Sequence, residues 1–414
     1  MLTSTALVLA MNIPGLSMFY GGLVGKKNVL SIFASCMALT CFMSLMWFSF
    51  GYSLSFGAGN AFIGDFSKIF LGGVNAMSNA VGTIPEPLWV MFQSTFAVIA
   101  PGLIIGAFAE RMKFSAMLSF SALWSVLVYY PFAHMVWGGG FLEHLGILDF
   151  AGGIVVHLTA GAAALLACIM IGPRKSGPVE PHNLPMMITG TGILWVGWFG
   201  FNAGSAVAAN AGAAMAMVAT MAAAAAGGAT WMLLDWWRDG KPATLGLCCG
   251  VVAGLVCVTP GAGFVSPMGA AIMGIMSGAI CRWASTTMKE KLGYDDALDV
   301  WGVHGMGGLL GNELTAIFGA TQFGGTEIVA SVPKLFAIHT ASSVFAIVWS
   351  MAATFVILKA IDATIGLRPS EAGEKVGLDA SDHGEVGYIL SDEDDEEPPT
   401  EVAPVEKLPA PALA

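Results

Sequence analysis

Residues 148–171 read Leu-Asp-Phe-Ala-Gly-Gly-Ile-Val-Val-His-Leu-Thr-Ala-Gly-Ala-Ala-Ala-Leu-Leu-Ala-Cys-Ile-Met-Ile, with Asp149 near the start and His157 eight residues later. A helix needs roughly 20 mostly apolar residues to cross the hydrocarbon core of a bilayer, and this stretch is long enough. Small residues such as Gly161 let neighbouring helices approach closely in lipid. The segment therefore predicts a membrane-spanning helix that carries a histidine in its interior.

The composition of the whole chain is that of a membrane protein. Of its 414 residues, 56% are hydrophobic and only 11% are charged, whereas a soluble domain carries about 25% charged residues. Much of the formal net charge of −11 lies after Arg368, in an acidic C-terminal stretch. There is no basic patch with interleaved aromatic residues, so no nucleic-acid binding is expected. The seven cysteines show no spacing typical of a metal site, so no metal or other cofactor is expected.

Ten further apolar stretches flank this segment, so the sequence predicts an all-α polytopic membrane protein with eleven transmembrane helices. The sixth to tenth stretches are rich in glycine and alanine, and their hydropathy is weaker. The predicted spans are residues 2–23, 29–56, 88–108, 114–133, 148–171, 184–201, 212–234, 243–258, 268–288, 298–318 and 334–360.

The charges between the spans predict an orientation. Cytoplasmic loops carry an excess of lysine and arginine, and here the cations follow every odd-numbered span from the first to the ninth. The other set of loops holds only Lys68 and Lys334, so we expect the N-terminus outside and the C-terminus inside. The cations on the predicted inner side are Lys26, Lys27, Arg111, Lys113, Arg174, Lys175, Arg238, Lys241, Arg282, Lys289 and Lys291.

A second segment repeats the spacing of the first. Residues 296–304 read Asp-Ala-Leu-Asp-Val-Trp-Gly-Val-His, and Gly308 follows four residues after His304. Both segments fit Asp-x7-His-x3-Gly, and they lie in the fifth and tenth predicted spans. Because these spans are five apart, the two halves of the chain enter the membrane in opposite senses. This pattern predicts an inverted five-helix repeat, which in transporters places the substrate path between the halves.

The two histidines are the strongest candidates for function. Eight helical residues span about 12 Å, so each histidine is expected near the middle of the membrane. Ionisable residues at this depth are costly and usually face a cavity or one another. The alternative is a histidine packed between helices and satisfied by a backbone carbonyl. Asp149, for its part, is expected to cap its helix and to order the outer vestibule.

Four motifs resemble those of one family, the ammonium transporters (Amt/MEP/Rh), on the Amt branch. They are Pro-Gly-Leu-Ser-Met-Phe-Tyr-Gly-Gly-Leu at 14–23, the 149–157 stretch, Gly-Trp-Phe-Gly-Phe-Asn-Ala-Gly-Ser at 197–205, and Gly-Val-His-Gly at 302–305. Residues 377–388 resemble the cytoplasmic tail segment of the family. The resemblance implies eleven helices, a homotrimer with one pore per subunit, and a PII-type regulatory protein as a partner at the cytoplasmic face.

The resemblance also implies roles for individual side chains. Two positions depart from the family pattern: Trp301 stands where phenylalanine is expected, and Gly387 where alanine is usual. Motif matching gives His157 and His304 as twin pore histidines, Trp198 as a pore-lining residue, Phe96 and Phe201 as a stacked outer gate, and Phe92, Trp137, Ser205 and Asp149 as an outer site that recruits ammonium.

The expected function is therefore ammonium transport, with ammonia conducted past the histidines. An ammonium sensor and a neutral gas channel of the Rh type remain alternatives, and no nucleophile or metal constellation predicts an enzyme. We expect residues 1–361 to form the transmembrane transporter domain, 362–390 a cytoplasmic C-terminal region and 391–414 an acidic, disordered tail. The protein is expected in the plasma membrane, or in the inner membrane of a Gram-negative bacterium. No basic residue precedes Lys26, so the pattern predicts no cleavable signal peptide.

Overall fold

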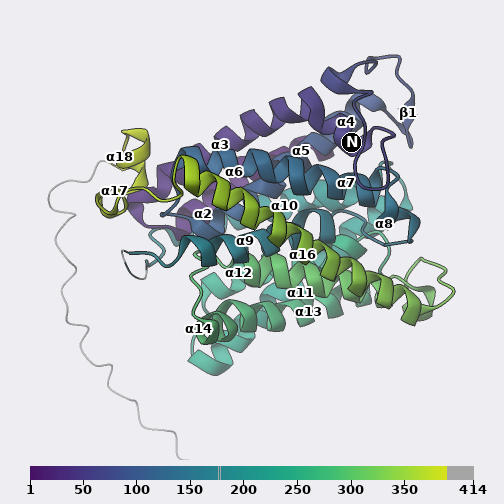
Figure 1. Ribbon diagram of the computed structural model, residues 1–414. Helices are drawn as coiled ribbons and strands as arrows, with labels where there is room; N and C mark the ends of the chain where they lie inside the picture. Colours follow the sequence, from purple (N-terminus) through teal and green to yellow (C-terminus); the bar gives the residue numbers. More distant parts are fainter. Residues whose placement is uncertain (176, 178, 389–414) are drawn as a thin grey trace, which may run out of the picture.

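The computed structural model describes residues 1–175, 177 and 179–388, and the protein is mostly helical, at 74%. Its long helices run side by side in one bundle (Figure 1). Strands β1 (Ala80–Val81) and β2 (Ile84–Pro85) form a small antiparallel hairpin before α5. The helices are α1 (Leu2–Ala10), α2 (Ser17–Leu23), α3 (Val29–Met46), α4 (Tyr52–Phe56), α5 (Glu86–Ile104), α6 (Phe114–Trp124), α7 (Tyr130–Trp137), α8 (Phe141–His144), α9 (Thr159–Ile171), α10 (Leu184–Gly204), α11 (Ala211–Asp239), α12 (Thr244–Val258), α13 (Pro267–Trp283), α14 (Lys289–Leu292), α15 (Met306–Phe318), α16 (Val332–Thr364), α17 (Glu371–Val376) and α18 (Leu378–His383).

Nine helical segments within the described residues are long and apolar enough to cross a membrane. They coincide with the first eight predicted spans and the eleventh, with ends that differ by a few residues; the fourth is longer than predicted because α8 extends it. The nine segments are Leu2–Leu23, Lys26–Phe56, Glu86–Phe108, Phe114–His144, Gly153–Ile171, Leu184–Gly204, Ala211–Asp239, Thr244–Gly261 and Val332–Thr364.

The ninth and tenth predicted spans are also helical, but they are not among these nine. The region 268–288 lies in α13 and the turn after it, and its last residues include the buried Arg282. The region 298–318 lies in α15 and the turn before it, and Asn312 and Glu313 lower its hydropathy. The count of eleven spans therefore stays a prediction.

Several spans contain a π-helical turn, in which hydrogen bonds join residues five apart. Such turns lie between α3 and α4 (Trp47–Gly51) and between α6 and α7 (Ser125–Tyr129), whereas Met11–Leu16, between α1 and α2, is a kink in which Ile13 has an extended backbone. Two more, at Gly153–Leu158 and Trp301–Gly305, begin the segments that continue as α9 and α15. Each turn admits one extra residue and changes the direction in which the following side chains point.

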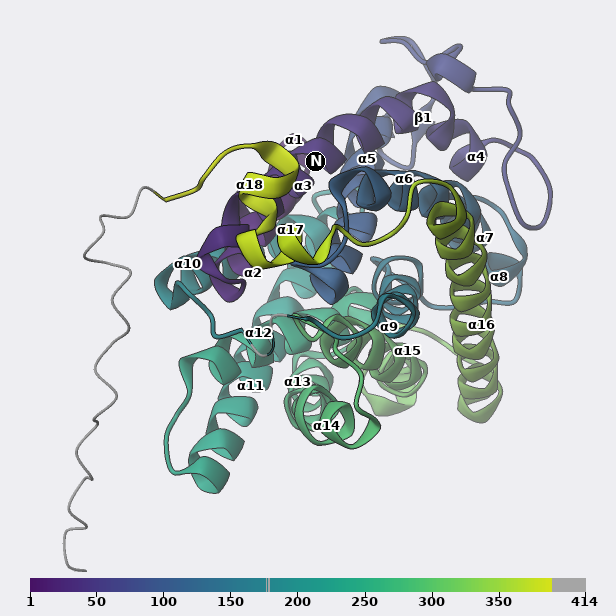
Figure 2. The ribbon, with the colours of Figure 1, turned by 60° about the vertical axis from the view of Figure 1, so that its left-hand side comes forward.

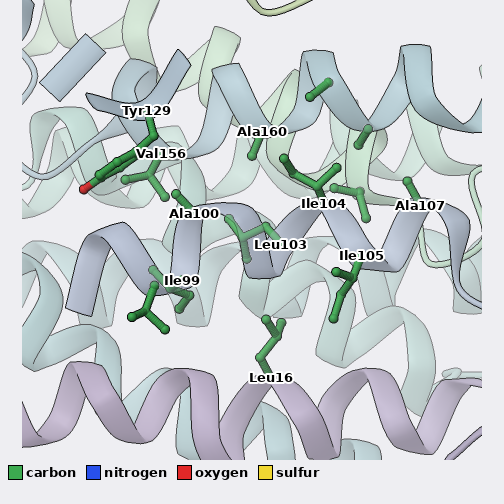
Figure 3. Packing of buried hydrophobic residues seen from close by; sticks show 14 of the residues in the cluster. Leu16, Ile99, Ala100, Leu103, Ile104, Ile105, Ala107, Tyr129, Val156 and Ala160 are labelled. Atoms are coloured by element: carbon green, nitrogen blue, oxygen red, sulfur yellow. The ribbon is translucent and has the colours of Figure 1, made fainter. Parts of the chain in front are cut away.

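The core of the bundle combines branched side chains with close backbone contacts. Figure 3 shows Leu103 of α5 between Leu16 on one side and Ala160 of α9 on the other. Where α11 meets α12, a Cβ atom on Gly227 would lie 2.4 Å from the carbonyl oxygen of Gly250. Only glycine allows this approach, which agrees with the close packing of small residues in membrane helices.

The loops that carry most of the predicted inner cations meet at one end of the bundle. Nη1 of Arg111 lies 2.7 Å from the carboxylate of Asp295, and Nη2 of Arg174 lies 2.8 Å from the same group. Burial alone would raise the pKa of Asp295, but Arg111 and Arg174 outweigh it and hold this pKa below its usual value. The cluster therefore joins the loops after the third, fifth and ninth predicted spans.

The described part of the C-terminal region lies against this same end. The carboxylate of Asp379 accepts hydrogen bonds from the N–H groups of Leu30 (3.0 Å) and Ser31 (2.7 Å), at the start of α3. The N–H group of Leu378 donates to Oδ1 of Asn28 at 2.7 Å. Figure 2 accordingly shows α18 beside the beginning of α3. The predicted tail 391–414 lies outside the described residues, and the domain boundaries stay predictions.

Candidate functional site

Two buried histidines meet where α9 and α15 begin. His157 and His304 are 2% and 4% exposed, and their Nδ1 atoms lie 3.2 Å apart. The rings are stacked, with centroids 5.3 Å apart and an angle of 15° between their planes. At this distance one Nδ1 donates and the other accepts, so two neutral imidazoles hold a single proton between these two nitrogens. The pair is thus built to adopt complementary tautomers.

The two histidine segments cross through their glycines. A Cβ atom on Gly161 would lie 2.3 Å from the Cα atom of Gly305, next to His304. A Cβ atom on Gly308 would lie 2.9 Å from the backbone nitrogen of Leu158, next to His157. The glycine four residues after each histidine therefore packs against the partner histidine's segment, which is why the sequence repeat extends past the histidines.

A narrow cavity lies against both imidazoles, and we call it the histidine cavity. Its volume is about 10 Å³, which is at the lower limit for a single water molecule. Nε2 of His157 is buried without a hydrogen-bond partner in the described part of the chain. The lining residues are Met11, Leu16, Phe19, Ile99, Leu103, Val156, His157, Leu194, Trp198, Phe201, Val252 and His304. The lining is therefore apolar apart from the imidazoles and the Trp198 indole nitrogen.

Trp198 supports one side of the histidine pair. Its indole stacks on the imidazole of His157, with centroids 5.4 Å apart and planes at 15°. Its Nε1–H donates to Oγ1 of Thr259 at 2.8 Å. This hydrogen bond fixes the indole, and the indole in turn fixes the plane of the imidazole.

Phe96 and Phe201 form a stacked pair beside the histidine cavity. Their rings are stacked, with centroids 4.1 Å apart and planes at 22°. Phe201 lines the histidine cavity, whereas Phe96 lines a second and larger cavity. The stacked pair therefore separates the two cavities.

The larger cavity, of about 290 Å³, is rich in aromatic and polar side chains, and we call it the aromatic cavity. Phe96, Trp137, Ser205 and Asp149 line it together. Phe92 lies behind it, because its ring packs edge-on against Phe96 with centroids 5.0 Å apart. The other lining residues are Trp89, Gln93, Val136, Glu143, Ile147, Phe150 and Phe264.

Asp149 connects the aromatic cavity with the histidine segment. Its carboxylate accepts hydrogen bonds from four successive N–H groups, those of residues 152–155, at 2.6 to 3.3 Å. These bonds satisfy the donors at the start of the helix that carries His157, as a helix cap does. The backbone carbonyl of Asp149 accepts the Nε1–H of Trp137 at 2.8 Å. One residue thus fixes both the helix and the indole.

Asp296, the counterpart of Asp149, has fewer partners. Its Oδ2 accepts the N–H of Trp301 at 2.7 Å, and its Oδ1 is buried without a partner among the described residues. Burial, and next the nearby Asp299 carboxylate, raise the pKa of Asp296 to about 6. Asp299 is itself paired with Lys289.

Three polar residues near the site, Gln93, Glu143 and Thr259, were not predicted from the sequence. Gln93 and Glu143 line the aromatic cavity, and Thr259 holds Trp198. Gln93 follows Trp89 by four residues and precedes Phe96 by three, so helical spacing alone would have placed it on the same face. Thr259 and Glu143 gave no such signal, because their positions depend on how distant segments meet.

Comparison with known proteins bears on the whole chain. The family model described as Ammonium Transporter Family matches residues 1–388. The chain is 44% identical over 393 residues to a protein of Aquifex aeolicus named ammonium transporter, and the match covers 94% of this chain and 92% of that protein.

Solved structures of similar proteins agree. The structure titled Sensor Amt Protein has a TM-score of 0.86 at 28% identity, covering 92% of this chain and 96% of that one. Mep2 of Candida albicans has a TM-score of 0.83 at 38% identity, covering 89% of this chain and 85% of that one. The apolar helices and the fold define an integral membrane protein. The chain belongs to the ammonium transporter family, which confirms the resemblance seen in its sequence motifs.

Proposed function

We propose that the chain is an ammonium transporter that binds ammonium in the aromatic cavity, removes its proton near Phe96 and Phe201, and conducts ammonia past His157 and His304. The observation that carries this proposal is the histidine pair, held at 3.2 Å in a narrow apolar cavity beneath a stacked phenylalanine pair.

The aromatic cavity suits a small cation that donates hydrogen bonds. Aromatic faces attract cations by about 0.5 to 2 kcal/mol, depending on desolvation. The Trp137 N–H donates to the backbone carbonyl of Asp149, and the Ser205 hydroxyl donates to the carbonyl of Phe201 at 2.9 Å. Trp137 therefore offers the ammonium its ring face, and Ser205 offers the lone pairs of its oxygen. Potassium has a similar size but donates no hydrogen bond, so directional acceptors can distinguish the two cations.

The histidine cavity suits the neutral species. A bare cation there would lose its hydration without recovering it from an apolar lining, and this cost is large. Ammonia can accept from one imidazole nitrogen and donate to the other. The released proton either returns to the aromatic side or crosses separately along the imidazoles, and only the second route moves charge.

The same proposal includes the predicted architecture. Eleven spans form an inverted five-helix repeat, with the N-terminus and the aromatic cavity outside and the C-terminus inside. The crossing of the two histidine segments at Gly161 and Gly308 supports this repeat. We also propose a homotrimer in the plasma membrane, regulated by a PII-type protein at the cytoplasmic face, on family resemblance alone.

The test is a transport measurement on purified protein in liposomes. Wild type is expected to give a current or an internal pH change on an ammonium pulse, and no signal with potassium. His157→Ala and His304→Ala should change the ammonium/potassium selectivity. A pH change without current would establish neutral ammonia transport. Absence of both signals, with ammonium still bound, would rule out transport.

A sensor is the second candidate, because one similar structure is titled Sensor Amt Protein. A sensor would bind ammonium but show no flux. The liposome measurement combined with a binding measurement therefore separates the two.

A further inference from the structure

We propose that Gln93 is a direct ligand of ammonium, and that its side-chain oxygen selects the cation inside the aromatic cavity. This inference rests on the proposed function and adds a specificity-determining residue to it.

The backbone places Gln93 on the cavity face of α5. Trp89, Gln93 and Phe96 are separated by four and three residues, so they share one face of the helix. All three line the aromatic cavity, with Gln93 between an indole and the phenylalanine that separates the cavities. A cation that moves along this face toward Phe96 passes the amide.

The side chain of Gln93 is buried and incompletely bonded. The residue is only 4% exposed, and its Oε1 has no hydrogen-bond partner in the described part of the chain. It is the one residue lining the aromatic cavity that has such an atom among those described. Buried polar atoms are nearly always bonded, so an unbonded amide oxygen on a residue that lines the cavity indicates a donor that the chain itself does not supply.

The neighbouring groups define the chemistry of that guest. The Nε1–H of Trp137 and the hydroxyl hydrogen of Ser205 are both donated to backbone carbonyls, so these two groups offer no hydrogen to the cavity. Glu143, whose Oε2 accepts the N–H of Gly139 at 2.8 Å, adds a carboxylate to the lining. The cavity thus offers hydrogen-bond acceptors, aromatic faces and the carboxylate of Glu143, and this set suits a small cation with several N–H donors.

The experiment compares two variants of nearly equal shape. Gln93→Leu removes the acceptor, and Gln93→Glu keeps an acceptor and adds a charge. Half-saturating ammonium should rise roughly tenfold in Gln93→Leu, because a hydrogen bond to a cation is lost. It should fall in Gln93→Glu at low salt, and maximal flux is recorded beside it. Gln322→Leu, in an exposed segment, is the matched control and should change neither value.

Opposite effects of the two variants cannot arise from a merely structural glutamine, which would lose stability in both. Unchanged half-saturation in both variants, or lower maximal flux and melting temperature in both, would overturn the inference. If wild type shows no flux, the transport proposal fails, and calorimetric titration with ammonium still tests the ligand: the dissociation constants should then follow the same order.

Discussion

Asp149 and Asp296 each stand eight residues before a histidine, and they meet different neighbours. Asp149 accepts four backbone N–H groups, whereas Asp296 accepts those of Trp301 and Val300 and keeps a buried oxygen unbonded. Both loops place a left-handed residue three positions later, with φ of +110° at Gly152 and +59° at Asp299. Equal spacing therefore fixes the position of a carboxylate along its helix, while the bonds that it makes depend on the loop.

The sharpest way to test this difference is to remove each carboxylate. Asp149→Ala leaves up to four N–H groups without an acceptor, so we expect a loss of about 3 kcal/mol or more of stability. Asp296→Ala loses fewer such bonds and should cost less. Thermal unfolding of both variants in detergent measures the difference. Equal losses would contradict the comparison.

The glycine crossing gives the next largest effect. Gly161→Ala would set a Cβ atom 2.3 Å from backbone atoms of Gly305, which cannot move aside without shifting a helix. Gly308→Ala meets its nearest atoms at 2.9 Å. Overpacking of this kind costs about 1 to 3 kcal/mol, so we expect Gly161→Ala near the upper value and Gly308→Ala near the lower. Melting temperatures in the reverse order would show that the two contacts are not as the structure has them.

A smaller effect, and one that depends on pH, is expected at Asp296. Because its folded-state pKa of about 6 lies above the usual value of 3.8, the folded protein holds the proton more tightly than the unfolded chain. Stability from this group is then present at low pH and is lost as pH rises from about 4 through 6. Asp296→Asn should therefore gain melting temperature over wild type at pH 7.5, with a smaller gain at pH 4.5. A gain that is the same at both pH values would exclude this cause.

The smallest change in stability is expected from substituting the tryptophans near the histidines, Trp301 and Trp198. Nε1 of Trp301 is buried without a partner among the described residues, whereas Nε1 of Trp198 is bonded to Thr259. Trp301→Phe removes an unsatisfied donor and should change stability by less than about 1 kcal/mol. Trp198→Phe removes a satisfied one and its contact with His157, and should cost more. Unfolding measurements on both variants check this order.

Most of the fold could be predicted because membrane spans leave a direct signal in hydropathy. The first eight segments and the last were located to within a few residues, apart from the longer fourth. The ninth and tenth predicted spans carry a weaker signal, because packing against neighbouring helices allows glycine, Asn312 and Glu313 there. The π-helical turns were not predicted, since no residue type marks them.

The candidate site was predictable where motifs carry it. The sequence placed His157, His304, Phe96 and Phe201 among the site residues, and the structure brings them into contact. It offered no means to find the Trp198–Thr259 bond or the lining by Glu143, which join residues distant in the chain. Their roles in transport stay proposals until the variants are measured.

Each histidine lies in a π-helical turn, Gly153–Leu158 or Trp301–Gly305. The direction of each imidazole therefore depends on how many residues precede it in its segment. Successive residues of an α-helix advance by about 100° around its axis, so one residue more or fewer changes the phase of everything beyond it. Deleting a single residue between Asp149 and His157 would keep α9 helical but turn the imidazole away from its partner. The contact between the two imidazole rings thus depends on the number of residues between each aspartate and its histidine, which is the same in both segments, as much as on the histidines themselves.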